Sequence, residues 1–144
     1  MSSVQAASIV PKKHLRRALL ALACAAGVFA VQAQSAMPQW KGEGAVRYVC
    51  GGIGSDESTA MRAAMKEHPL ALLFARSDGA YLADVQVDIK GADGAPSLAL
   101  RASGPVCLVD LPAGRYTIDA AMAGSAKSQT VTVGGGSKTV DFRF

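Results

Sequence analysis

The sequence predicts a mainly β protein, an antiparallel two-sheet β-sandwich of about seven or eight strands with one short helix after the first strand. Three observations lead to this fold class. Short runs of β-forming residues fill the chain from about residue 70 onward, with Gly, Pro or Asp in the breaks. The breaks are too short for crossover helices, which favours antiparallel pairing. Before these runs, one stretch has the apolar spacing of a helix.

Residues 1–33 are predicted to be a secretory signal peptide. Its basic part contains Lys12, Lys13, Arg16 and Arg17. The uncharged stretch 18–31 follows, and it is shorter than the roughly 20 residues of a membrane-spanning helix. Small residues near its end suit cleavage after Ala33. We therefore expect a periplasmic or secreted protein with no stable membrane span after cleavage.

Two alternatives to a cleaved signal peptide stay open. One is a retained N-terminal anchor. The other is a lipoprotein acylated at Cys24, although the apolar stretch continues past this cysteine, which is the wrong order for a lipoprotein signal.

The positive net charge of the chain belongs to the predicted signal peptide. The whole chain has 15 Lys and Arg residues against 11 Asp and Glu residues. Without the four basic residues of the signal peptide, the two signs balance. A neutral mature chain gives no reason to expect binding to nucleic acid or to anionic lipid.

Cys50 and Cys107 are the two cysteines of the predicted mature chain. In an oxidising compartment such a pair is a candidate disulfide. The alternative, that both are small buried residues that never meet, stays open because free cysteines are common in protein cores.

The predicted mature chain begins with a flexible lead-in at 34–44, followed by one domain at 45–144. Trp40, in the lead-in, is expected to fold back over an exposed edge of the domain, and the alternative is a loose surface anchor for a partner. A first strand is predicted at 45–50 and ends in a Gly-rich turn at 51–54. The helix is predicted at about 55–67, with Ser55 as an N-cap candidate and an apolar stripe of Met61, Ala64 and Met65.

Two strands, 70–75 and 81–89, are predicted to form a hairpin through Asp78 and Gly79. In the second strand Val85, Val87 and Ile89 share one face and polar residues share the other, which indicates a sheet with one wet face. Further strands are predicted at 97–101, 106–111, 116–122, 129–133 and 139–144.

The sequence LPAGRYTI at 111–118 places Pro112 and Gly114 in a turn before Tyr116. Together with the strands around 85–89 and 131–133 and the turn at 91–94, it resembles the carboxypeptidase regulatory-like, transthyretin-like (prealbumin-like) family of β-sandwich domains. The resemblance covers about 70–144. It implies an immunoglobulin-like or prealbumin-like sandwich that acts as a non-catalytic folding or interaction module.

The segment 48–69 lies outside that family pattern. It looks like small exported proteobacterial proteins that carry such a domain. The related hydroxyisourate hydrolases use several histidines and a characteristic C-terminal tetrapeptide. The predicted mature chain has His68 alone and ends in DFRF, so we do not expect that activity.

No catalytic, cofactor-binding or metal-ligating residue is predicted. His68 has no second histidine beside it for a metal, and Ser55 and Ser58 have no base. The candidate ligand site is Gly52, Gly54 and Ser55, because a glycine turn at a helix N-terminus exposes amides that attract anions. Asp56 and Glu57 already place negative charge there, which favours a purely structural turn.

From these features we predict an exported, non-catalytic module that acts as a periplasmic binding or accessory protein. Its expected partner is an envelope protein or surface component. The alternative is a structural subunit or assembly factor of a cell-surface structure, using the lead-in or an exposed edge strand. An enzyme is not expected, because the residues offer no paired acid and base.

Overall fold

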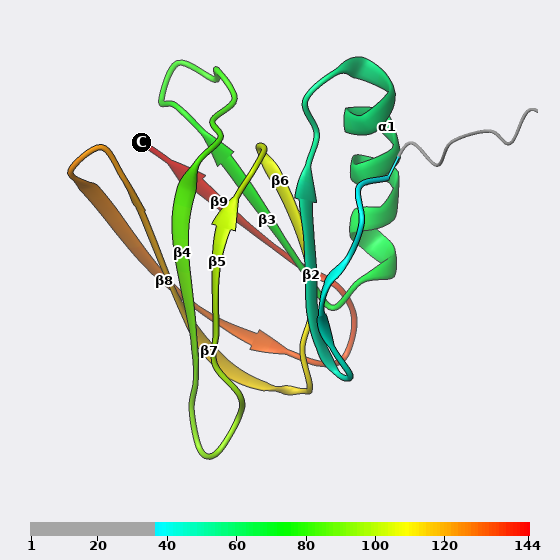
Figure 1. Cartoon of the computed structure of the whole chain (residues 1–144). Helices are drawn as coiled ribbons and strands as arrows, with labels where there is room; N and C mark the ends of the chain where they lie inside the picture. The colour runs from blue at the N-terminus through cyan, green and yellow to red at the C-terminus, as the bar shows by residue number, and fades with distance from the viewer. Residues whose placement is uncertain (1–36) are drawn as a thin grey trace, which may run out of the picture. The chain divides into compact units, whose positions relative to one another are not determined.

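The computed structural model describes residues 37–144, which form two β-sheets packed face to face and one helix (Figure 1). The predicted signal peptide at 1–33, its cleavage after Ala33 and Cys24 lie outside the described residues. The predicted lead-in at 34–44 is described only from residue 37.

Five strands form the first sheet, here called sheet A. Its order is β1 (Lys41–Glu43), β2 (Val46–Gly51), β6 (Val106–Asp110), β3 (Leu70–Ala75) and β9 (Lys138–Arg143). Four strands form sheet B, in the order β5 (Leu98–Ala102), β4 (Val85–Gly91), β7 (Gly114–Met122) and β8 (Ser125–Val133). The predicted two-sheet sandwich is confirmed.

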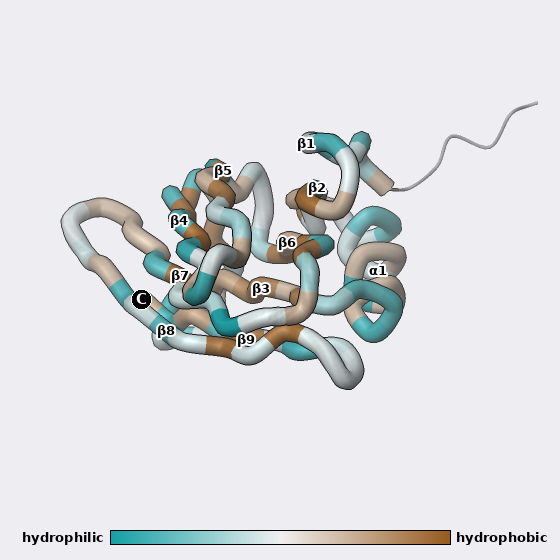
Figure 2. The backbone as a smooth tube through the Cα atoms, turned by 90° about the horizontal axis from the view of Figure 1, so that it is seen from below, coloured by the Kyte–Doolittle hydropathy of each residue, from teal (hydrophilic) through white to brown (hydrophobic). Residues whose placement is uncertain are grey.

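The main core lies between the sheets. Phe74 of β3 and Phe142 of β9 stack with ring centroids 5.7 Å apart, and Tyr116 from sheet B is fully buried with them. Along β4, buried and more exposed residues alternate, so the predicted wet face of this strand is confirmed. The same alternation of apolar and polar residues is visible along β4 and β5 in Figure 2.

Helix α1 (Ser55–Ala64) covers the other face of sheet A and continues as a 3-10 turn, η1 (Met65–Glu67). The predicted apolar stripe is confirmed. Met61 is fully buried against the outward side chains of sheet A, and Ala64 and Met65 pack beside it. The N-cap residue is Gly54, and no side chain caps the helix. The prediction of Ser55 as the N-cap residue is therefore wrong.

The predicted hairpin of 70–75 with 81–89 is wrong. β3 belongs to sheet A and β4 to sheet B, and a single bridge between Ala75 and Tyr81 is the only pairing of the two segments. Asp84 has a φ of 61° just before β4 begins. β3 is apolar on both faces, one packed in the core between the sheets and the other under α1. Crossing between the sheets turns the one apolar face of β4 toward that same core.

Two further differences concern the strands. β3 and β9 pair in parallel, with Leu70 opposite Lys138, whereas the sequence predicted antiparallel pairing throughout. β9 enters sheet A from β8 in sheet B, and a connection between sheets does not force the chain direction to reverse. In addition, β1 forms within the predicted lead-in and pairs with β2, Lys41 opposite Tyr48.

Candidate functional site

The candidate site begins where β2 ends and β6 begins. Cys50 and Cys107 lie directly opposite each other on these two antiparallel strands, with their sulfur atoms 2.08 Å apart. The predicted disulfide pairing is therefore confirmed. It joins the strand that leads into the glycine turn to the strand that follows residues 103–105, so these two segments are covalently connected.

At this end of sheet A the backbone at Gly104 lies too close to that of Gly51 to leave room for a side chain. A Cβ atom at Gly104 would collide with the backbone of Gly51. The hydroxyl of Ser103 donates a hydrogen bond of 3.1 Å to the carbonyl of Cys50. Gly52 and Gly54 have φ values of 93° and 89°, which only glycine adopts without strain. These contacts fix the path of the turn.

The Gly52 amide has an acceptor within the chain. It donates a hydrogen bond of 2.7 Å to Oε1 of Glu57, so a carboxylate of the chain itself lies where the sequence suggested an external anion. Ser55 is exposed in the first turn of α1. Gly52 and Gly54 line an apolar groove instead.

This groove, called here the Ile53–Tyr81 groove, has a volume of about 350 Å³. It is lined by Gly52, Ile53, Gly54, Tyr81, Leu82, Ala83 and Pro105. Ile53 and Tyr81 are 64% and 62% exposed and are the large hydrophobic residues that the described chain leaves open to solvent. A single exposed hydrophobic side chain is ordinary, whereas here two lie beside one groove.

A second hollow, called here the arginine hollow, adjoins the groove and shares Tyr81 and Pro105 with it. Its volume is about 160 Å³. The rest of its lining is Arg62, Leu73, Phe74, Ala75, Gly79, Asp141 and Arg143. The guanidinium of Arg62 lies over the Tyr81 ring, 4.9 Å from its centroid. Charge therefore borders the apolar groove on one side.

The two other charged residues of the arginine hollow are paired with each other. Nε and Nη2 of Arg143 donate to the two carboxylate oxygens of Asp141 at 3.0 and 2.9 Å. The hydrogen bonds and the charge of Asp141 raise the pKa of Arg143. The Asp141 charge is thus largely matched by Arg143.

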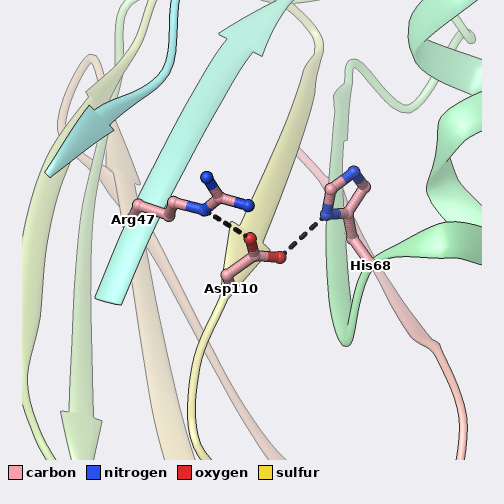
Figure 3. A network of polar contacts seen from close by, with 3 residues as sticks. All are labelled: Arg47, His68 and Asp110. Atoms are coloured by element: carbon pink, nitrogen blue, oxygen red, sulfur yellow. Dashed lines mark hydrogen bonds and ion pairs between the residues drawn. The ribbon is translucent and has the colours of Figure 1, made fainter. Parts of the chain in front are cut away.

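A separate polar network surrounds Asp110 at the end of β6 (Figure 3). Its carboxylate accepts from Nε of Arg47 at 2.8 Å, and its other oxygen lies 2.8 Å from Nδ1 of His68. Burial acts to raise the pKa of Asp110, but the hydrogen bonds from His68 and Arg47 outweigh burial and lower this pKa. The network stabilises an ionised carboxylate.

Trp40 completes this network and folds back on the domain, as expected. Its ring centroid lies 4.7 Å from that of His68, and the Arg47 guanidinium lies 4.8 Å from it. Trp40 is also packed, partly buried, beside the cluster under α1. Trp40 contacts both residues that share the Asp110 carboxylate, His68 and Arg47. These contacts hold the N-terminal segment against the domain.

Within residues 37–144, no group of three His, Cys, Asp or Glu residues is placed to hold a metal ion. No helix in that part of the chain has both the length and the apolar character needed to cross a bilayer.

Taken together, the described residues form a disulfide-containing β-sandwich with a helix on one outer face and an apolar groove beside the helix N-terminus. No family model, no curated protein and no solved structure matches the chain. Resemblance to the carboxypeptidase regulatory-like family therefore stays a prediction.

Sequence reasoning found the glycines of the groove but not its exposed side chains. The sequence predicts Tyr81 at the start of a strand and Arg62 within the helix, and neither prediction marks an exposed binding residue. The one available signal was Ile53, a large aliphatic residue between glycines in a turn.

Proposed function

We propose that this protein is an exported, non-catalytic β-sandwich module, a periplasmic or secreted binding or accessory protein. Its partner is an envelope protein or surface component, held in the Ile53–Tyr81 groove. The observation that carries the proposal is the exposure of Ile53 and Tyr81, at 64% and 62%, on the same groove. Burying both side chains in a partner would remove apolar surface from water, the main driving force of association.

The rigidity of the groove supports this role. Its glycine side is fixed by the Cys50–Cys107 disulfide, by the Glu57 hydrogen bond to Gly52 and by the close approach of Gly104 to Gly51. A surface that is ordered before binding loses little conformational entropy on binding. The disulfide also agrees with an oxidising compartment, as the predicted signal peptide requires.

The placement of His68 also supports binding over catalysis. His68 is the one histidine among residues 37–144. Its hydrogen-bond partner Asp110 also accepts a hydrogen bond from Arg47. None of these three residues lines the groove. The groove itself offers apolar contact, and its polar atoms are those of the backbone and of the Tyr81 hydroxyl.

Site-specific photo-crosslinking in cells tests the proposal. A benzophenone amino acid at position 53 should give a discrete crosslinked species in the envelope fraction. The same amino acid at Ala99, exposed on β5 of sheet B, is the matched control and should give none. Adding Tyr81→Ser should abolish the adduct from position 53. An adduct that survives Tyr81→Ser, or equal adducts from 53 and 99, would contradict the proposal.

One observation favours the alternative of a structural subunit or assembly factor. β8 is an edge strand of nine residues, paired only with β7 in its sheet and exposed at 125–130. Such edges pair with other strands. This alternative predicts that the mature protein self-associates as concentration rises. Light scattering that gives the monomer mass at every concentration would contradict it.

A further inference from the structure

The arginine hollow extends the Ile53–Tyr81 groove from an apolar surface to a charged one. Both depressions are lined by Tyr81 and Pro105, so a ligand that covers the Tyr81 ring edge reaches both. Volumes of about 160 and 350 Å³ leave room for a small polar group in the hollow and a larger apolar group in the groove.

The hollow has an unbalanced positive charge. Arg62 and Arg143 face one acidic residue, Asp141, whose two oxygens are both bound by Arg143. Within residues 37–144, Arg62 forms no ion pair, and its one hydrogen bond is a long one of 3.4 Å from Nε to Ser58. The two terminal nitrogens of Arg62 are thus available for an acceptor.

Stacking over Tyr81 positions the Arg62 guanidinium, which lies 4.9 Å from the ring centroid. Arg62 is half-buried, so its charge is screened less than that of a fully exposed arginine. A planar guanidinium held in this way binds a carboxylate through two parallel hydrogen bonds. The hollow therefore has the geometry and the charge for one carboxylate.

We propose that the occupant is a peptide segment of the partner that carries an apolar side chain next to a carboxylate, and that Arg62 binds this carboxylate. The apolar side chain lies in the groove between Ile53 and Tyr81. This inference rests on the proposed function of the groove. Tyr and Arg are the residue types enriched in the energetic centres of protein interfaces, which favours a protein segment as the occupant.

A random heptapeptide phage library, panned against the folded mature protein, tests the inference. The expected result is enrichment of peptides with a large apolar residue beside Asp or Glu. Panning against Arg62→Gln should keep the apolar preference and lose the acidic one. Arg115→Gln is the matched control, because Arg115 is an exposed arginine of β7 that lines neither depression, and it should leave both preferences unchanged.

The strongest selected peptide and its Glu→Gln or Asp→Asn analogue then give the size of the effect. We expect the analogue to bind the unaltered protein about tenfold more weakly, the usual loss for a charge-assisted hydrogen bond. This comparison does not depend on the folding of any protein variant. Equal affinities would overturn the inference.

Failure of the inference and failure of the proposed function give different results. Apolar peptides that bind without acidic residues, and lose binding in Tyr81→Ser, overturn the role of Arg62 but keep the groove. Absence of any enrichment relative to Tyr81→Ser overturns both.

Discussion

Nδ1 of His68 lies 2.8 Å from Oδ1 of Asp110, although the two residues are 42 positions apart. An ionised carboxylate only accepts hydrogen bonds, so Nδ1 carries the proton and donates it. Arg47 donates to the other oxygen, and the Trp40 ring contacts both His68 and Arg47. The Asp110 carboxylate thus connects β2, β6 and the residue after η1, and Trp40 joins the N-terminal segment to them through His68 and Arg47.

The first prediction concerns that carboxylate. Asp110→Asn removes the charge while keeping the size of the side chain. We expect a loss of about 1 to 2 kcal/mol in the free energy of unfolding, because two charge-assisted hydrogen bonds are weakened. Urea unfolding measures it. The control is Asp84→Asn, whose ion pair with Arg101 is exposed and should change stability by less than about 0.5 kcal/mol. Equal losses in the two variants would contradict the role of Asp110.

The second prediction is the pH dependence of that loss. The pKa of Asp110 is lowered from the ordinary value of 3.8, so the folded protein binds this proton less readily than the unfolded chain. The stabilisation is complete above the unfolded pKa and disappears as pH falls through the folded pKa. The difference in stability between the unaltered protein and Asp110→Asn should therefore be constant above about pH 5 and shrink below about pH 4.

Urea unfolding of both proteins between about pH 2.5 and pH 7 checks this dependence. Asp119, whose pKa is also lowered, by hydrogen bonds from Lys90 and Ser128, is present in both proteins, so its contribution cancels in the difference. A difference that persists unchanged at the lowest pH would show that the ionised form of Asp110 is not the stabilising one.

Local patterns in the sequence were sufficient for the individual elements. Alternation along 85–89 identified the buried face of β4, and the spacing of Met61, Ala64 and Met65 identified the face of α1 that packs on sheet A. The disulfide followed from the count of cysteines in the predicted mature chain. Each of these depends on residues close in sequence or on chemistry that is independent of the fold.

Prediction from the sequence failed for the long-range arrangement of the strands in the two sheets. The turn residues Asp78 and Gly79 are compatible with a hairpin and also with a crossing between sheets, and the choice depends on packing that local sequence does not contain. The exposed face of Tyr81 is a consequence of that crossing. Arg62 became a candidate binding residue only because α1 lies beside the crossing segment, so the candidate site could not be found before the topology was known.

The third prediction concerns the disulfide. The double variant Cys50→Ala/Cys107→Ala opens a loop with a sequence separation of 57. The chain-entropy account gives a loss of about 4 kcal/mol, because the unfolded chain gains freedom. Guanidinium unfolding measures it, and the reduced unaltered protein should match the variant. A variant as stable as the oxidised protein would show that the bond does not stabilise the fold.

The fourth prediction concerns Tyr116, which the sequence placed after the LPAG turn. Its hydroxyl donates a hydrogen bond of 2.7 Å to the carbonyl of Pro112, and its side chain is fully buried. Tyr116→Phe leaves that carbonyl without this donor and should cost about 1 to 2 kcal/mol in the free energy of unfolding. Tyr81→Phe is the matched control, since the exposed Tyr81 hydroxyl makes no hydrogen bond within residues 37–144, and we expect a change below about 0.5 kcal/mol. If urea unfolding gives the same small change for both variants, water replaces the tyrosine hydroxyl at Pro112, and the turn before β7 does not depend on Tyr116.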